Sequence, residues 1–245
     1  MKSRTRKFLP IITSIGLLFA AACGSADPGL IDAPEPAAST HDTDTEENPD
    51  ELTSIAPQGD AYTIVMLGDS LTAGFGLPQA QALPEQLERL LEPEYPNVDL
   101  VNAGVSGDTS AGGLARYDWS VASAQPDLLV IALGANDYLS GLDPAQTRDN
   151  LAEIIERGLA DEVAVLLVSL SARSTAADDP RAATFANIYP ELAEAYDVAL
   201  YEGLVDPIYN KPELLMPDGL HPTAAGVEVI AAPLAEAITP LLSAN

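Results

Sequence analysis

The 245-residue sequence contains a single cysteine, Cys23, so it can form neither an internal disulfide nor a zinc site built on several cysteines. Histidine is almost as scarce, because only His41 and His221 occur, and a neutral-pH base of this type has two candidates at most. Lys and Arg number 11 against 37 Asp and Glu, and four of those 11 lie in the first seven positions. A chain with a formal net charge of −26 is a poor candidate for nucleic-acid binding, which needs clustered Lys and Arg, and the same charge argues against a chain that lies flat on anionic lipid.

The first 23 residues are organised like an export signal. The start is basic, with Lys2, Arg4, Arg6 and Lys7. An apolar run at residues 8–22 follows, which is short for a membrane-spanning helix and ends in small residues. Cys23 after three alanines resembles the lipobox of bacterial lipoproteins, which implies a lipidated, outer-membrane lipoprotein that faces the periplasm. The alternative is ordinary cleavage that releases a soluble periplasmic or secreted product.

Residues 24–60 contain few large apolar side chains and are rich in Ala, Pro, Ser, Thr, Asp and Glu. Such a segment cannot bury enough apolar surface to offset the entropy lost on ordering, so we expect a disordered acidic tether. His41 lies within this tether. His221 is therefore the only histidine of residues 61–245, which we expect to form one folded domain.

From Ala61 onward, apolar segments of strand length alternate with segments of helical periodicity. Strands are expected at residues 62–67, 98–101, 127–133, 163–170 and 198–201. Strands that alternate with helices favour a parallel sheet covered on both faces. The sequence therefore predicts an α/β fold of three layers, α/β/α, with a five-stranded parallel sheet in the flavodoxin-like order 2-1-3-4-5.

Three segments that follow strand ends carry unusual chemistry. Ser70 comes after the first strand, the glycine-rich residues 102–113 come after the second, and Asn136 and Asp137 come after the third. The carboxyl ends of parallel strands meet at one edge of the sheet, where ligands bind in open α/β folds. We therefore expect these segments to converge on one crevice.

Ser70 is the candidate nucleophile, and a serine hydroxyl needs a general base in contact with it. His221 is the only histidine available in the folded segment, and Pro222 after it suits the first position of the last helix. Asp218, three residues earlier, can fold back and orient the imidazole. The alternative interpretation is a chain-turning Gly/Ser loop, a structural histidine and a simple Asp-Gly turn.

Acyl transfer also needs donors aimed at the developing oxyanion, and the candidates are the backbone N–H groups of Ser70 and Gly104 and the Asn136 amide. A phosphate-binding glycine loop at residues 102–113 is discounted, because no Gly-Lys-Ser/Thr element accompanies it. Apolar loop residues could line an acyl groove, although ordinary packing explains them as well. These candidates are Leu77, Tyr138, Leu139 and Met216.

Four blocks of the sequence resemble those of the SGNH/GDSL hydrolase family, and most closely its bacterial arylesterase and thioesterase I–lysophospholipase branch. The blocks are Gly68-Asp69-Ser70-Leu71, Gly104, Gly134-Ala135-Asn136-Asp137 and Asp218-Gly219-Leu220-His221-Pro222. The resemblance implies the SGNH hydrolase fold, with Ser70 as nucleophile, His221 as base and Asp218 as its orienting acid. It also implies an oxyanion hole formed by Ser70, Gly104 and Asn136.

The resulting prediction is a serine esterase that hydrolyses aryl or short- to medium-chain acyl esters through an acyl-enzyme. Thioesters and lysophospholipids are further candidate substrates. No metal or organic cofactor is required, and we expect a monomer attached to a membrane only through its lipid. Two alternatives stay open: a carbohydrate acetyl-esterase of the same family, and a non-catalytic binding lipoprotein of the cell envelope.

Overall fold

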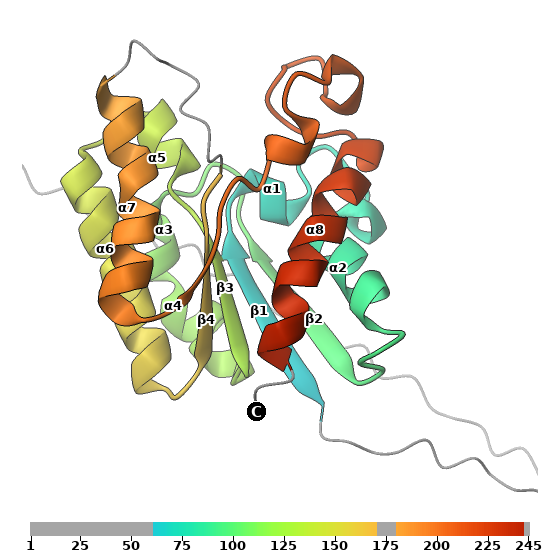
Figure 1. Ribbon diagram of the computed structural model, residues 1–245, viewed down its shortest axis with the longest axis horizontal. Coiled ribbons are helices and arrows are strands. Elements are labelled where there is room, and N and C mark those ends of the chain that lie inside the picture. The colour runs from blue at the N-terminus through green and yellow to red at the C-terminus, as the bar shows by residue number, and fades with distance from the viewer. Residues whose placement is uncertain (1–60, 171–179, 243–245) are drawn as a thin grey trace, which may run out of the picture. The chain divides into compact units, whose positions relative to one another are not determined.

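The computed structural model describes residues 61–170 and 180–242, and Figure 1 shows a parallel sheet between two layers of helices. The strand order is β2-β1-β3-β4-β5, and every neighbouring pair is parallel. The strands are β1 (Tyr62–Gly68), β2 (Val98–Gly104), β3 (Leu128–Ala132), β4 (Ala164–Val168) and β5 (Ala199–Tyr201). The predicted fold class and strand order are confirmed.

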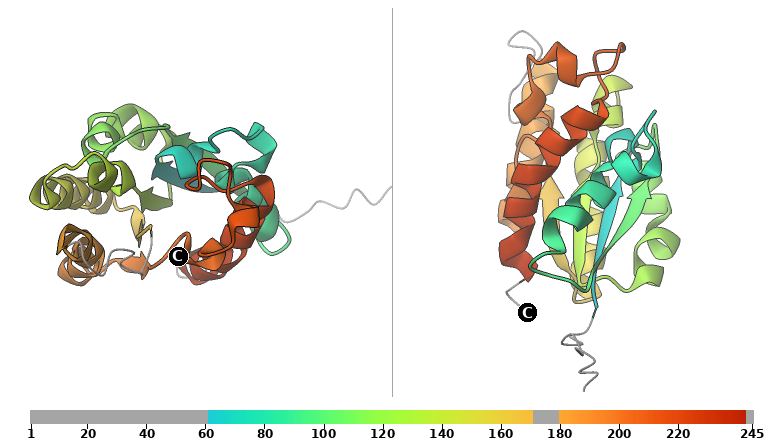
Figure 2. Two further views of the ribbon diagram at one scale, coloured as in Figure 1. Left: turned by 90° about the horizontal axis from the view of Figure 1, so that it is seen from above. Right: turned by 90° about the vertical axis from the view of Figure 1, so that its right-hand side faces the viewer.

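Helices cover both faces of the sheet, as the view from above in Figure 2 shows. One layer contains α2 (Leu83–Leu91) and α8 (Ala224–Leu242), and the other contains α6 (Pro144–Ala160) and α7 (Pro180–Tyr196). The shorter helices are α1 (Ser70–Ala73), α3 (Ser110–Ala115), α4 (Tyr117–Ser120) and α5 (Ala135–Leu139). Short 3₁₀ turns lie at Gln79–Gln81, Ala122–Ala124, Asp206–Ile208 and Pro212–Leu214.

The sheet divides the core into two apolar clusters because side chains alternate along a strand. Ile64 and Met66 of β1 pack with α2 and α8, whereas Val65 and Leu67 pack with α6 and α7. All four side chains are fully buried. A strand buried on both faces has a continuous apolar sequence, which explains why β1 was recognisable as a central strand.

Helix α8 is the one described helix that is long and apolar enough to cross a membrane. Its apolar face, which includes Val227, Ile230 and Leu234, is buried in the same cluster as Leu87 and Leu91 of α2. This is the packing of a core helix that covers a sheet face.

Strand β2 is three residues longer than expected, which is a correction to the sequence analysis. It pairs with β1 in register from Tyr62 opposite Val98 to Gly68 opposite Gly104. Residues 102–104 therefore belong to the sheet and not to the loop that follows it. The small side chains there made the segment look like a loop, while backbone pairing with β1 keeps it extended.

Candidate active site

Ser70 occupies a sharp turn between β1 and α1. The side chain of Asp69 caps the helix by accepting a hydrogen bond from the Leu71 N–H at 3.0 Å. Gly68 allows the close approach behind the turn, since a Cβ there would lie 2.0 Å from Thr72 Oγ1. Gly74, at φ 74°, ends the helix after four residues. The Gly-Asp-Ser order thus places the serine at the first position of α1, at the carboxyl edge of the sheet.

A small hairpin at residues 214–223 carries Asp218 and His221. The Met216 N–H donates to the His221 carbonyl at 2.7 Å, and the Thr223 N–H donates to the Leu214 carbonyl at 2.9 Å. Gly219 lies at the tip with φ 68°. Asp218 and His221 therefore leave the same tight turn, which holds their side chains together.

The expectation that Pro222 opens the last helix is wrong. Pro222 pairs with Leu215 across the hairpin, and α8 begins at Ala224. Thr223 serves as the cap instead, because its Oγ1 accepts a hydrogen bond from the Gly226 N–H at 3.2 Å.

Ser70, His221 and Asp218 form a continuous chain of polar contacts. His221 Nε2 lies 2.9 Å from Ser70 Oγ, and His221 Nδ1 lies 2.8 Å from Asp218 Oδ2. The other carboxylate oxygen of Asp218 accepts hydrogen bonds from the N–H groups of His221 and Leu220, at 3.0 and 2.9 Å. The arrangement suits a proton on Nδ1 and leaves Nε2 as the acceptor that faces the serine hydroxyl.

The Asp218 carboxylate is held in its charged form. The backbone N–H and the side chain of His221, followed by the Leu220 N–H, lower the pKa of Asp218 from its ordinary 3.8 to about 2. Hydrogen bonds to the ionised form produce this shift. At neutral pH the carboxylate therefore offers a negative charge to the imidazole at all times.

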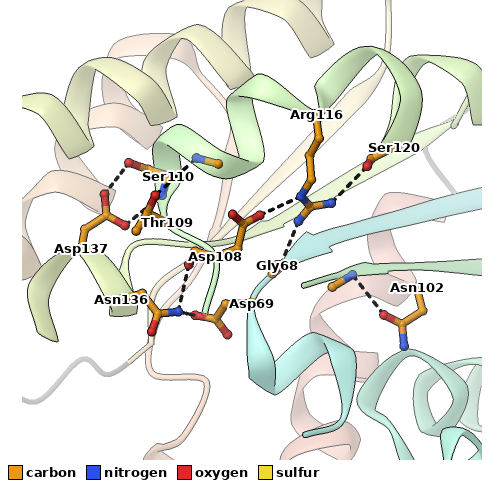
Figure 3. Close-up of polar contacts among 12 residues, drawn as sticks. Gly68, Asp69, Asn102, Asp108, Thr109, Ser110, Arg116, Ser120, Asn136 and Asp137 are labelled. Atoms are coloured by element: carbon orange, nitrogen blue, oxygen red, sulfur yellow. Dashed lines mark hydrogen bonds and ion pairs between the residues drawn. The ribbon is translucent and has the colours of Figure 1, made fainter. Parts of the chain in front are cut away.

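Gly104 does not lie where the sequence analysis placed it. Its N–H donates to Asn102 Oδ1 at 3.1 Å, which Figure 3 draws beside the labelled Asn102. A Cβ at Gly104 would lie 2.2 Å from the Ala73 nitrogen, so this glycine allows β2 to pack closely against α1. Gly104 is therefore a packing glycine whose N–H is already engaged, and the prediction of an oxyanion donor there is corrected.

Gly107, three residues further on, lies in the cavity that Ser70, Asn136 and His221 line. It has φ 84° in a turn in which the Asp108 N–H donates to the Val105 carbonyl at 3.0 Å. Within residues 61–170 and 180–242, the N–H groups of Gly107 and Ser70 donate no hydrogen bond. Sequence reasoning missed Gly107; the available signal was a Ser-Gly-Asp turn directly after the strand.

Asn136 lies on α5, which follows a left-handed residue, Gly134, at φ 110°. Its Nδ2 donates to the Asp108 carbonyl at 2.9 Å and lies 3.4 Å from Asp69 Oδ2 (Figure 3). The amide thus lies between the loop after β2 and the turn that carries Ser70. It faces the same cavity as Ser70 and His221.

Two buried aspartates hold the surrounding loops. Burial raises the pKa of Asp69 from 3.8 to about 6, although the hydrogen bond from the Leu71 N–H opposes the rise. Asp137 is fully buried and accepts hydrogen bonds from the Ser110 N–H at 2.8 Å and from Thr147 Oγ1 at 3.0 Å. Asp137 therefore joins the start of α3 to α5 and does not face the cavity.

Ser70 opens onto apolar space. The cavity at Ser70 has a volume of about 360 Å³, and a second cavity of about 670 Å³ adjoins it. The two share five lining residues, namely Ala135, Leu139, Leu170, Val205 and Leu220. Of the predicted substrate contacts, Leu139 lines both cavities and Tyr138 lines the larger one.

Leu77 and Met216 line neither of these cavities. Leu77 packs against the core cluster beneath α2 and α8, and the Met216 side chain lies beside Gly76. The apolar character of a loop residue therefore did not show whether its side chain lines a cavity or packs against the core.

Comparison with known proteins agrees with this geometry. The GDSL-like Lipase/Acylhydrolase family model matches residues 66–229. The esterase TesA of Pseudomonas aeruginosa is 35% identical over 175 residues, which are 71% of this chain and 86% of that protein. Thioesterase 1/protease 1/lysophospholipase L1 of Escherichia coli K12 is 34% identical over 183 residues, which are 75% of this chain and 86% of that protein.

A solved structure gives the same result. The crystal structure of AlinE4, described as a SGNH-hydrolase family esterase, superposes with a TM-score of 0.62 at 37% identity and covers 76% of this chain and 99% of its own. The family resemblance drawn from the four sequence blocks is thus confirmed. On the family model and these relatives, the chain belongs to the GDSL-like lipase/acylhydrolase family.

Proposed function

We propose that this protein is a serine esterase in which Ser70 is the nucleophile, His221 the general base and Asp218 its orienting acid. The observation that carries the proposal is the chain of contacts from Ser70 Oγ to His221 Nε2, at 2.9 Å, and from His221 Nδ1 to Asp218, at 2.8 Å. A nucleophile, a base and an orienting group within hydrogen-bond reach are the parts that acyl transfer needs. The names of the relatives, esterase TesA and thioesterase 1/lysophospholipase L1, support the reaction class.

The first half of the reaction forms an acyl-enzyme. Ser70 Oγ attacks the ester carbonyl while His221 Nε2 takes the hydroxyl proton, and Asp218 stabilises the imidazolium that results. The carbonyl oxygen becomes an oxyanion. The Asn136 amide stabilises it together with the N–H groups of Ser70 and Gly107, which donate to no acceptor among the described residues. Collapse of the tetrahedral intermediate breaks the ester bond, and His221 gives its proton to the leaving alcohol.

Water completes the cycle. A water molecule gives a proton to His221 Nε2 and attacks the acyl carbonyl, and the same donors stabilise the second oxyanion. The carboxylic acid leaves and Ser70 Oγ regains its proton from His221. His221 carries every proton in this sequence, between Ser70 Oγ, the leaving alcohol and water, while Asp218 stays ionised.

The substrates that we propose are aryl and short- to medium-chain acyl esters, with the acyl group in the apolar cavities beside Ser70. The larger cavity offers about 670 Å³, and its lining includes Tyr138, Phe185 and Ile208. Apolar lining with few polar groups suits an acyl chain. Thioesters and lysophospholipids also contain an acyl carbonyl that the serine can attack. The name of the relative thioesterase 1/protease 1/lysophospholipase L1 supports testing both classes.

The test is a series of p-nitrophenyl esters from acetyl to dodecanoyl, assayed with wild type, Ser70→Ala and His221→Ala. Both variants are expected to lower turnover by about 10⁴-fold or more, because nucleophile and base act as one unit. A His221→Ala variant with near-wild-type turnover would refute the mechanism. Acetylated xylan in the same panel distinguishes a carbohydrate acetyl-esterase from an esterase that prefers aryl or acyl esters. A wild-type protein that is inactive on every ester would indicate a non-catalytic binding protein.

We also propose that the exported protein is attached to the cell envelope through lipid on Cys23. The support is the sequence pattern of residues 1–23, which lie outside the described residues. Cys23→Ser is expected to move the protein from the membrane fraction to the soluble fraction after cell lysis. A Cys23→Ser protein that sediments with membranes as wild type does would count against lipidation.

A further inference from the structure

Arg116 and Asp108 form an ion pair behind the proposed oxyanion hole. Arg116 Nε donates to Asp108 Oδ2 at 2.7 Å, and the two side chains are 8% and 13% exposed. The Arg116 guanidinium also donates to Ser120 Oγ at 3.1 Å and to the Gly68 carbonyl at 3.0 Å. Figure 3 shows all three contacts around the guanidinium. Arg116 thus has three hydrogen-bond partners and lies directly behind the loops that carry Ser70 and Gly107.

One partner of Arg116 is a rigid point of the fold. Gly68 is the last residue of β1, and it pairs with β2 on one side and β3 on the other. Its carbonyl also accepts a hydrogen bond from the Val105 N–H at 3.0 Å. The sheet therefore fixes Gly68 without help from Arg116, and the guanidinium acts as a brace between this fixed point and Asp108.

The turn at residues 105–108 is tied to Gly68 at both ends. Val105 binds the Gly68 carbonyl through its own N–H, and Asp108 reaches the same carbonyl through Arg116. Gly107, whose N–H faces no acceptor among the described residues, lies between these ties. The direction of the Gly107 N–H depends on both ends of the turn staying in place.

Asp108 also holds the other proposed donor. Its backbone carbonyl accepts a hydrogen bond from Asn136 Nδ2 at 2.9 Å. An amide nitrogen carries two hydrogens, so the bond to Asp108 fixes the amide plane, and the second hydrogen makes only the long contact of 3.4 Å to Asp69 Oδ2, which a ligand oxygen would replace. A shift of Asp108 would move Gly107 and Asn136 together.

The fit around the Asp108 carboxylate is tight. A Cβ at Gly112 would lie 1.8 Å from Asp108 Oδ1, so the glycine leaves room for the carboxylate in the orientation that meets Arg116. The Gly112 N–H donates to Thr109 Oγ1 at 3.3 Å, which places this part of α3 against the loop. The carboxylate is therefore confined by packing as well as by charge.

We propose that Arg116 and Asp108 are positioning residues for the oxyanion hole, setting the Gly107 N–H and the Asn136 amide relative to Ser70. The proposal rests on the esterase mechanism described above. Neither side chain touches the reacting atoms; their effect passes through the turn at residues 105–108. Preorganised donors lose effect when they are displaced by a fraction of an ångström, so loss of the brace should lower turnover and leave substrate binding nearly unchanged.

The test measures kcat and KM on a p-nitrophenyl ester for Arg116→Gln, Asn136→Ala and the double variant in the full chain. Arg116→Gln is expected to lower kcat roughly 10- to 100-fold with KM within about threefold, since removal of a whole oxyanion donor costs about 10²- to 10³-fold. The loss in the double variant should be at least about tenfold smaller than the product of the two single losses. Arg157→Gln, which breaks the ion pair between Arg157 and Asp118 outside the site, is the matched control and should keep wild-type kcat.

A folding defect is separated from a positioning effect by circular dichroism and by Asp108→Asn, which keeps a neutral acceptor for Arg116 and leaves no unpaired carboxylate. If Arg116→Gln does not fold, Asp108→Asn carries the same double-variant test, with a smaller loss of kcat expected. Independent losses that multiply, or an unchanged kcat in folded Arg116→Gln, would overturn the proposal. Wild type without esterase activity would instead refute the proposed function, so the two failures are distinct.

Discussion

The aromatic ring of Phe75 lies against the imidazole of His221, with ring centroids 4.3 Å apart and planes inclined by 32°. Phe75 lies between Gly74 and Gly76, which adopt φ values of 74° and 73°. These left-handed residues turn the chain back after α1, so that a side chain five residues from Ser70 covers the imidazole of His221. Phe75 also lines the cavity at Ser70 and remains 47% exposed.

Phe75→Ala is expected to lower kcat by about 2- to 10-fold, since an aromatic pair contributes about 0.5–1.5 kcal/mol beyond the area that it buries. The physical reason is that one face of His221 becomes open to water and the imidazole gains freedom to rotate away from Ser70. Steady-state kinetics on a short ester measures the effect. Phe75→Tyr keeps the ring and should retain most of the activity; equal losses in both variants would contradict a stacking role.

Gly104 and Gly107 offer a matched pair of glycine-to-alanine changes. Gly104→Ala is expected to lower the free energy of unfolding by about 1–3 kcal/mol, because the new Cβ meets the Ala73 backbone at 2.2 Å. Gly107→Ala meets nothing within 4 Å, but its φ of 84° strains an alanine by about 1–2 kcal/mol and favours a shift of the turn. We expect the Gly107 variant to lose at least about tenfold in kcat.

Urea unfolding together with kinetics separates the two effects. The outcome that contradicts the corrected assignment is a folded Gly107→Ala protein with full activity. Such a result would mean that a backbone N–H other than that of Gly107 is the second donor of the oxyanion hole.

The raised pKa of Asp69 predicts a pH-dependent difference in stability between wild type and Asp69→Asn. In the folded protein the carboxyl binds a proton below about pH 6, whereas its ordinary pKa in an unfolded chain is 3.8. The contribution of this group to the free energy of unfolding is therefore largest at low pH and is lost as the pH rises through about 6. From pH 4 to pH 8, wild type should lose about 2–3 kcal/mol relative to Asp69→Asn, which does not titrate.

Urea denaturation of both proteins at pH 4, 5, 6, 7 and 8 measures this difference. A difference in unfolding free energy that stays constant across the series would show that the Asp69 pKa is not raised. The comparison between variants removes the contributions of the other carboxyl groups, which both proteins share.

If the larger cavity holds the acyl chain, a bulky side chain at Ala186 should change which acyl chain lengths the enzyme accepts. Ala186 lies on α7 and lines this cavity. Ala186→Trp should fill part of the cavity and lower kcat/KM for decanoyl and dodecanoyl esters at least about tenfold, with little effect on acetyl and butyryl esters. Ala183→Trp, on an exposed position of the same helix, is the matched control and should leave the chain-length profile unchanged. A uniform loss across all chain lengths in Ala186→Trp would place the acyl group elsewhere.

Local sequence determined the sheet and the position of Ser70, the proposed nucleophile. A continuous apolar strand such as β1 is recognisable because it is buried on both faces, and Gly68 marks where it stops. The scarcity of histidine then left His221 as the only base to pair with Ser70, and Asp218 was found by its spacing. These inferences need only periodicity, turn chemistry and elimination.

Tertiary packing decided what sequence spacing could not. Two glycines three residues apart look equivalent in the sequence, but the Asn102 side chain engages the N–H of Gly104, whereas the N–H of Gly107 donates no hydrogen bond within the described residues. Leu77 and Leu139 are both apolar loop residues, yet one packs into the core and the other lines the cavities. The brace from Arg116 to Gly68, 48 residues away in the chain, exists only because α3, β1 and the loop after β2 meet in space. Side-chain type is local information, whereas the direction of a donor depends on contacts between segments distant in the sequence.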